Sequence, residues 1–121
     1  FNPLIKICKP FGFFDYVKLQ LNSYCVLSDS GTISEESAIM EFPAVSIRNS
    51  TERPEAIDAG SIVLGGITEN EVLNSIEICL QTYNVEDQSI PWEYKEKNVS
   101  SKIIRLIQSY TSIVNKDIWN K

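Results

Sequence analysis

The feature that most constrains the fold is an alternation of apolar runs and polar turns between residues 24 and 60. Two apolar runs, 24–27 and 44–47, each lead into a polar turn, 29–32 and 49–54, and each turn opens a segment of helical character. Short continuous apolar runs are typical of parallel strands that helices cover on both faces. Strands that alternate with helices at this spacing predict an α/β fold, a Rossmann-like parallel sheet with flanking helices.

Further elements are expected on both sides of this stretch. They are a strand over 4–8, a helix over 13–21, a strand over 62–64, a helix opening at 68, a loop over 87–92 and a last helix over 98–121. Phe14 is expected in the core. The last helix carries an apolar stripe that we expect to be buried, namely Val99, Ile103, Ile107, Tyr110 and Val114. The chain is thus predicted to form one partial domain over 1–121.

Two helix starts carry the same capping sequence. Thr32 with Glu35, and Thr68 with Glu71, fit the pattern in which a Thr and a Glu three residues later bond each other's backbone N–H. Thr51 is expected to cap the short helix whose first turn contains a proline. These spacings predict where the three helices begin.

The turn at Asp29–Thr32 is also a candidate anion site. Gly31 lets the backbone approach a ligand closely, and the N–H groups of Gly31 and Thr32 precede the helix and lack intrahelical partners. Ser30 adds a hydroxyl and an N–H. With the helix dipole, these donors suit a diphosphate beyond the strand ends. The alternative is that these side chains only cap the helix, and spacing alone leaves both interpretations open.

Three further side chains could complete a nucleotide site. Glu36 lies one turn after Thr32, and its carboxylate suits the two hydroxyls of a ribose. Arg53 stands at a helix start, where a cation is normally unfavourable, so it is a candidate for binding a phosphate or sugar edge. Alternatively, the glutamates that flank Arg53 simply neutralise it. Tyr16 lies off the apolar face of its helix and is a candidate for stacking on a flat ligand.

The composition argues against several classes of function. The net charge of −5 argues against a nucleic-acid surface. The chain has no His, which removes histidine acid–base chemistry and His-ligated metals, and we expect no metal or cofactor. No apolar run approaches the roughly 20 residues that span a bilayer, so no membrane partner is expected. The three cysteines, each in an apolar segment, predict reduced thiols in the core of a cytoplasmic protein.

The motifs resemble those of a known enzyme family. LSDSGTISEE at 27–36, FPAVSIRNSTERPEAIDAG at 42–60 and FGFFDYVKLQ at 11–20 are similar to the C-terminal part of the non-hydrolysing UDP-N-acetylglucosamine 2-epimerases. The resemblance covers residues 3–82 well and is weak beyond. The FGFFDY run, and Thr32 where the family generally has a second Gly, look more like the branch that makes UDP-N-acetyl-L-fucosamine for capsule or O-antigen synthesis.

The resemblance implies a fold, a ligand and a mechanism. The family has two Rossmann-like domains in a GT-B-like arrangement, and this chain would be part of the C-terminal one. Such isomerases invert C2 of a UDP-2-acetamido sugar by removing the C2 proton, expelling UDP and adding it back. The proton-moving residues of the family lie upstream, so no catalytic residue is expected here. By the same resemblance, the diphosphate is bound by Ser30, Gly31 and Thr32, the ribose by Glu36, and the rest of the nucleotide by Arg53 and Tyr16.

Three hypotheses follow for the chain. The first is the UDP-binding portion of a 2-epimerase, which binds UDP or a UDP-2-acetamido sugar and is inactive alone. Because the chain begins at Phe1, almost directly in a strand-like run, we expect a piece whose partner is a missing N-terminal domain or half-enzyme. An edge strand over 4–8 would also favour a homodimer. The alternatives are a stand-alone nucleotide-binding module without catalysis and a purely structural α/β domain.

Overall fold

A computed structural model describes residues 2–83 and 90–120. In chain order the elements are α1 (Phe13–Leu21), β1 (Val26–Ser28), α2 (Ile33–Met40), β2 (Ala44–Ser46), α3 (Pro54–Asp58), β3 (Val63–Leu64), α4 (Glu69–Thr82), the 3-10 helix η1 (Trp92–Lys95) and α5 (Val99–Asp117). The predicted loop over 87–92 lies half outside the described residues, and Trp92 already belongs to η1. The predicted alternation of strands and helices from residue 24 onward is confirmed.

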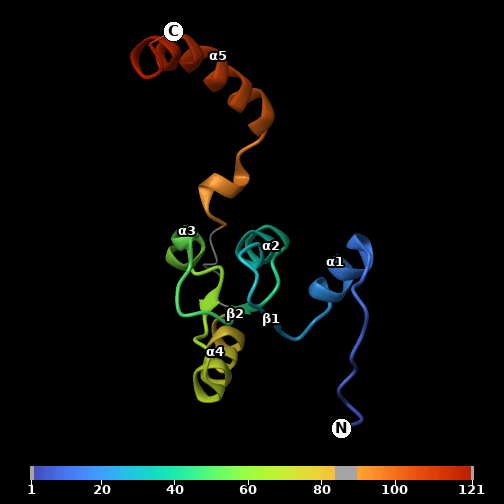
Figure 1. The fold of residues 1–121 in the computed structure, drawn as a ribbon. Coiled ribbons are helices and arrows are strands. Elements are labelled where there is room, and N and C mark those ends of the chain that lie inside the picture. The colour runs from blue at the N-terminus through green and yellow to red at the C-terminus, as the bar shows by residue number, and fades with distance from the viewer. Residues whose placement is uncertain (1, 84–89, 121) are drawn as a thin grey trace.

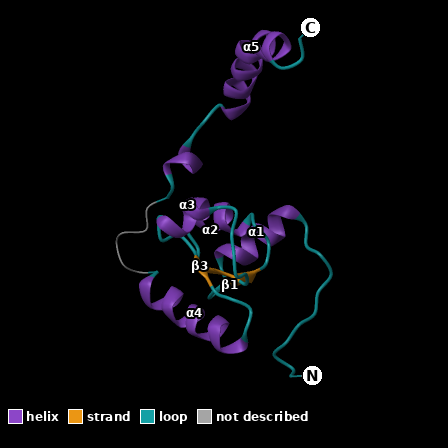
Figure 2. Ribbon diagram, turned by 60° about the vertical axis from the view of Figure 1, so that its left-hand side comes forward, coloured by secondary structure: helices purple, strands orange, loops and turns teal. Residues whose placement is uncertain are grey.

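Three parallel strands form the sheet in the order β1-β2-β3. All three residues of the central strand β2 are buried, as expected for a parallel strand with both faces covered. Helices α2 and α3 lie over one face of the sheet and α4 over the other (Figures 1 and 2). The turns that follow β1 and β2 therefore meet at the carboxyl edge of the sheet, beside the start of α2 and α3.

The core is small and lies between the sheet and the helices α2 and α3. It contains Ile33, Phe42, Ala44, Ala56 and Ile62. A buried hydroxyl, that of Ser37 on α2, lies 2.8 Å from the carbonyl oxygen of Phe42 and 3.2 Å from that of Ser61. One polar side chain thus joins the end of α2 to the loop that precedes β3.

The predicted strand over 4–8 is wrong. These residues have no strand pairing in the structure and lie exposed, with Leu4 87% accessible. A strand needs a neighbour to bond its backbone, and the described part of the chain supplies none for this segment. Cys8 is consequently exposed, against the prediction of a core thiol, whereas Cys79 is buried and its thiol donates to the carbonyl of Ala44.

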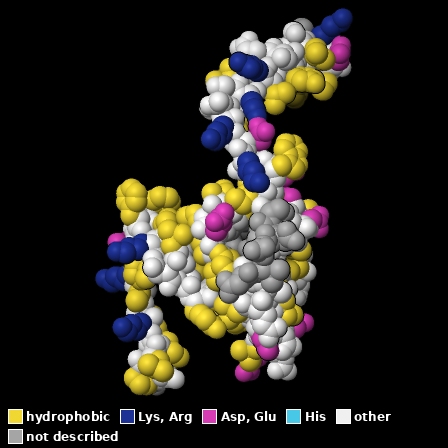
Figure 3. Space-filling model, turned by 180° about the vertical axis from the view of Figure 1, so that it is seen from behind, with side chains coloured by type: hydrophobic (Ala, Val, Ile, Leu, Met, Phe, Trp, Pro, Cys, Tyr) yellow, Lys and Arg dark blue, Asp and Glu magenta, His cyan; other side chains and the backbone are white. Residues whose placement is uncertain are grey.

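The predicted burial of the α5 stripe is also wrong. Every α5 residue is exposed except Val114, which is half-buried. Helix α5 projects away from the sheet in Figure 1, and Figure 3 shows hydrophobic side chains gathered along it. The pattern identified an amphipathic helix correctly, but a stripe is buried only where another surface packs on it. No helix in the described residues is long and apolar enough to cross a membrane.

Helix α1 reverses the expected roles of its side chains. Phe14, predicted to lie in the core, is 85% exposed. The one buried residue of α1 is the polar Gln20, at 3% exposure. The burial of an amide on this helix calls for a specific polar partner, because buried polar groups are nearly always hydrogen-bonded.

Candidate functional site

The turn between β1 and α2 keeps two backbone donors unused. The N–H of Ser30 donates to the hydroxyl oxygen of Ser28 at 3.1 Å, and the hydroxyls of Ser30 and Thr32 lie 3.0 Å apart. Among the described residues, the N–H groups of Gly31 and Thr32 donate to no acceptor. Because they precede the first turn of α2 at the carboxyl end of β1, they form the positive end of that helix.

The capping box predicted at Thr32 and Glu35 is wrong. Thr32 has helical backbone angles, φ −67° and ψ −15°, and its side chain accepts no cap hydrogen bond. The Glu35 carboxylate pairs instead with the Nε of Arg53. A charge-assisted bond to a guanidinium is stronger than a bond to a backbone N–H, so the partner from another segment prevails over the local one.

Arg53 lies against the bare backbone of Gly31. A Cβ added to Gly31 would come within 2.4 Å of Nη1 of Arg53. The hydrogen bond and the charge of Glu35 raise the pKa of Arg53, so the guanidinium is charged at all ordinary pH values. Glycine at position 31 is therefore what allows a cation from the second turn to reach the first.

The sequence left open that the glutamates flanking Arg53 simply neutralise its charge. In the structure these two glutamates pair with Arg53 only in part. Glu52 lies 4.0 Å from Nη1 of Arg53 but 2.9 Å from Nη1 of Arg48. Glu55 accepts a hydrogen bond from the Tyr94 hydroxyl at 2.9 Å. The close carboxylate is Glu35, from α2, so Arg53 joins α3 to the turn rather than forming a surface pair within its own segment. Thr51, the predicted cap of α3, accepts from the Arg53 N–H at 3.1 Å, and Arg53 itself is the N-cap.

A pocket of about 350 Å³ lies between α1 and α2, next to this turn. Its lining is mostly apolar and consists of Phe13, Tyr16, Val17, Gln20, Glu35, Glu36, Ile39 and Met40. Gln20 donates from Nε2 to Oε2 of Glu36 at 2.6 Å. Burial, followed by the charge of Glu36 and a hydrogen bond to it, raises the pKa of Tyr16. Tyr16 and Gln20, one helical turn apart on α1, thus both lie near the carboxylate of Glu36.

Two buried acceptors at this pocket have no donor. Among the described residues, Oε1 of Gln20 and Oε2 of Glu35 are buried without a hydrogen-bond partner. Unpaired buried polar atoms are rare in native proteins and call for an explanation. Both atoms belong to residues that line the pocket, whereas the adjoining turn offers N–H donors and a cation.

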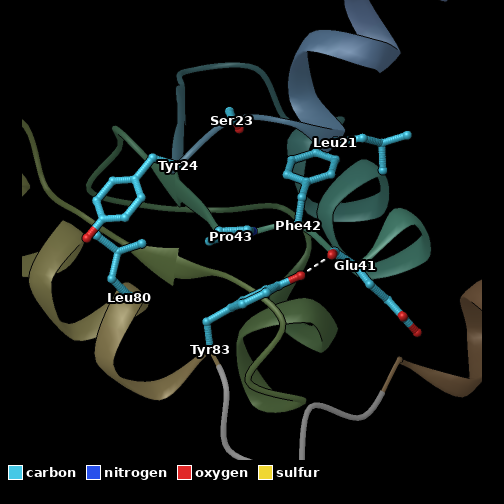
Figure 4. Close-up of a pocket in the computed structure, with 8 residues that line it drawn as sticks. All are labelled: Leu21, Ser23, Tyr24, Glu41, Phe42, Pro43, Leu80 and Tyr83. Carbon is cyan, nitrogen blue, oxygen red and sulfur yellow. Dashed lines mark hydrogen bonds between the residues drawn. The ribbon is translucent and has the colours of Figure 1, made fainter.

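A second pocket, of about 390 Å³, lies at the opposite edge of the sheet (Figure 4). Tyr24 and Pro43, which precede β1 and β2, line it, so it lies beyond the amino ends of the strands. The hydroxyl of Tyr83 donates to the backbone oxygen of Glu41 across it (Figure 4). Its lining includes a carboxylate and no Lys or Arg, so this pocket does not complement an anion.

The structure brings the predicted residues into two adjoining groups. Ser30, Gly31, Thr32 and Arg53 lie together at the turn, while Glu36 and Tyr16 lie in the neighbouring pocket. Sequence reasoning missed Gln20, although it follows Tyr16 by four residues and therefore shares its helix face. No cluster suited to a metal ion occurs in the described ranges.

Comparison with known proteins gives a consistent result. A family model described as UDP-N-acetylglucosamine 2-epimerase matches residues 1–108. The UDP-N-acetylglucosamine 2-epimerase of Methanococcus maripaludis is 38% identical over 81 residues, which cover 67% of this chain and 22% of the relative. The chain therefore spans about a fifth of that protein.

Solved structures share the fold. The UDP-N-acetylglucosamine 2-epimerase of Rickettsia bellii is 40% identical with a TM-score of 0.84, covering 96% of this chain and 32% of that one. A structure from Methanocaldococcus jannaschii, in complex with UDP-GlcNAc and UDP, is 29% identical with a TM-score of 0.74, covering 89% and 29%. With a family match over most of its length and the same arrangement of strands and helices, this chain belongs to the UDP-N-acetylglucosamine 2-epimerase family.

Proposed function

We propose that this chain is the UDP-binding portion of an enzyme that inverts C2 of a UDP-2-acetamido sugar. The observation that carries the proposal is the pair of unused N–H donors at Gly31 and Thr32 beside the Arg53 guanidinium. A diphosphate needs this combination of backbone donors and a fixed cation. The complex of the M. jannaschii relative with UDP-GlcNAc and UDP supports this class of ligand.

The two groups of residues divide the nucleotide between them. The turn would bind the diphosphate through the N–H groups of Gly31 and Thr32 and the hydroxyl of Ser30. The pocket between α1 and α2 would take the ribose on Glu36, with Tyr16 beside the base.

In the proposed reaction a base outside this chain takes the C2 proton, the bond from C1 to the UDP oxygen breaks and a C1=C2 double bond forms. UDP then adds back to C1 as an acid outside this chain returns a proton to the other face of C2. Negative charge grows on the diphosphate as it departs. Donors already aimed at that position stabilise the charge without reorganisation, which is electrostatic catalysis. The chain contains no His, and the carboxylates at the site are engaged with Arg53 and α1. We therefore propose that it binds UDP but does not move the C2 proton.

Titration calorimetry of the 121-residue chain with UDP tests the binding. The wild type should bind UDP and, more weakly, pyrophosphate, while the double variant Ser30→Ala, Arg53→Ala should show no heat. Arg105→Ala is the matched control, because Arg105 lies on the exposed helix α5, remote from the turn. Absence of heat from the wild type at millimolar UDP would contradict the proposal.

Nuclear magnetic resonance of UDP-N-acetylglucosamine incubated with the chain tests the second part. We expect no change at C2 with the chain alone. Turnover by the isolated chain would show that acid–base residues are present in it after all.

For the sugar, we propose the branch that makes UDP-N-acetyl-L-fucosamine in capsule or O-antigen synthesis. The support is the FGFFDY run at 11–16 and Thr32, whose hydroxyl meets that of Ser30 where the family generally has a glycine. Product analysis of a complete enzyme that contains this segment, offered each UDP-2-acetamido epimer pair, tests it. Exclusive action on UDP-N-acetylglucosamine would exclude this branch.

A further inference from the structure

We propose that Gln20 is a positioning residue that holds Glu36 in the orientation needed to recognise a ribose, so that the site selects ribonucleotides over 2′-deoxyribonucleotides. The inference rests on the proposed function, because it concerns the sugar of the same nucleotide. No motif singles Gln20 out; its role emerges from burial and contact.

The first support is where Gln20 lies. Gln20 is 3% exposed, although every Phe and Leu on the same helix is about half exposed or more. A buried primary amide is costly unless its groups are bonded. Its Nε2 finds a bond of 2.6 Å to Oε2 of Glu36, on a different helix, so the amide is placed for that carboxylate. Its Oε1 stays without a donor among the described residues, so the environment has not been arranged to satisfy Gln20 itself.

The second support is the number of acceptor positions on Glu36. A carboxylate offers about four lone-pair positions. Helix α1 directs the amide donor of Gln20 at one oxygen of this carboxylate. The remaining positions can accept both hydroxyls of the cis-diol of a ribose. A 2′-deoxyribose has one, and leaves one acceptor position of this half-buried carboxylate without that partner.

The third support is the rigidity that the contact gives. A free Glu side chain samples several rotamers, and fixing it costs conformational entropy at the moment of binding. The bond from Gln20 fixes one oxygen before a ligand arrives, so the diol meets a carboxylate that is already oriented. Binding of the diphosphate at the turn does not use this contact.

The test compares three ligands by calorimetry: UDP, 2′-deoxy-UDP and inorganic pyrophosphate. The wild type should prefer UDP over 2′-deoxy-UDP by about tenfold or more, the value of one hydrogen bond to a charged group. Gln20→Met keeps the size of the side chain and removes the donor. It should reduce the preference to less than about threefold and leave pyrophosphate binding unchanged. A merely structural role would weaken all three ligands together.

The chain supplies a matched control. Gln81 on α4 donates from Nε2 to Oε1 of Glu77 at 3.1 Å, so Gln81→Met removes the same chemistry from an exposed pair away from the site. It should leave the preference for UDP as in the wild type. Glu36→Gln should abolish the preference, and adding Gln20→Met to it should change nothing more. If Gln20→Met does not fold, Gln20→Asn replaces it, because its amide is one methylene too short to reach Glu36.

The outcomes separate this inference from the proposed function. A wild type that binds neither UDP nor pyrophosphate overturns both. A wild type that binds UDP but not in preference to 2′-deoxy-UDP, or a Gln20→Met variant that keeps the full preference, overturns the inference and leaves the UDP site standing.

Discussion

Helices α4 and α2 open with the same Thr-x-x-Glu sequence and use it in opposite ways. At α4, Glu71 accepts from the Thr68 N–H at 3.0 Å and donates its own N–H to the Thr68 hydroxyl, a complete capping box. At α2, Thr32 bonds Ser30 and the glutamate pairs with Arg53. The capping groups at the start of α4 bond each other. At the start of α2, the N–H groups of Gly31 and Thr32 have no acceptor among the described residues.

The glycines next to these two starts explain the difference. Gly66 lies over the Glu71 carboxylate, so that an added Cβ would come within 2.6 Å of Oε2. Gly31 lies under the Arg53 guanidinium in the same close manner. In α4 the charged group against the glycine belongs to the box itself. In α2 the charged group against the glycine is Arg53, from the turn after β2. Arg53 pairs with Glu35, which therefore does not cap the helix, and it adds positive charge beside the unpaired N–H groups of Gly31 and Thr32.

The largest expected effect comes from filling the space at Gly31. Gly31→Ala should weaken UDP binding by about 1.5–3 kcal/mol, the worth of a hydrogen bond to a charged group, because the Cβ displaces Arg53. Calorimetry measures it. Gly12→Ala is the control, since its Cβ would meet only the Asp15 carboxylate at 3.9 Å. Unchanged affinity in Gly31→Ala would separate Arg53 from ligand binding.

Replacing Thr68 and Thr32 separately by Ala compares how much each helix start contributes to the free energy of unfolding. Thr68→Ala should lower the free energy of unfolding by about 1 kcal/mol, as loss of an N-cap does, without affecting UDP. Thr32→Ala should change it by less than about 0.5 kcal/mol, because its side chain caps nothing. Urea denaturation of both variants checks this. Equal losses would mean that both helix starts depend on their threonine alike.

A smaller effect is expected at Glu35, which pairs with Arg53 instead of forming the predicted capping box. Glu35→Gln should tighten pyrophosphate binding by about twofold to fivefold, because it removes a negative charge that competes for Arg53 in a half-exposed pair. Calorimetry with pyrophosphate measures it, with Glu77→Gln on α4 as control. Weaker binding would show instead that Glu35 is needed to hold the guanidinium in place.

The smallest expected effect is a loss, at acid pH, of the stability that Glu71 contributes. The hydroxyl and N–H of Thr68, with the Ile67 N–H, lower the pKa of Glu71. A depressed folded-state pKa contributes stability above the ordinary glutamate value, about 4.3, and that contribution is lost as pH falls through the folded-state pKa. The stability difference between wild type and Glu71→Gln should therefore shrink below about pH 4, as urea midpoints at several pH values would show. A constant difference would contradict it.

Local patterns predicted the elements that depend on local chemistry. The alternation of strands and helices and the Thr68 box both follow from residues close in sequence. The family resemblance predicted that the Ser30 turn and Arg53 contact the nucleotide, which stays a prediction, and the structure places the guanidinium against Gly31.

Predictions that needed a distant partner failed. The strand over 4–8, the burial of Phe14 and the buried stripe of α5 each assumed a neighbouring surface that the described residues do not provide. The Thr32 box failed for the opposite reason, because a distant arginine was present. Gln20 was missed since an amide within an apolar helix has no meaning until its partner on α2 is known.

The buried hydroxyl of Ser37 has a mechanical consequence for recognition. One proton lies within reach of two carbonyls, that of Phe42 just after α2 and that of Ser61 in the loop that leaves α3. This buried hydroxyl thus connects α2 to the loop after α3, and the starts of these two helices carry the N–H groups and the guanidinium of the candidate site. Under the proposed function, a substitution at Ser37 is expected to alter nucleotide binding without removing any group that contacts the nucleotide.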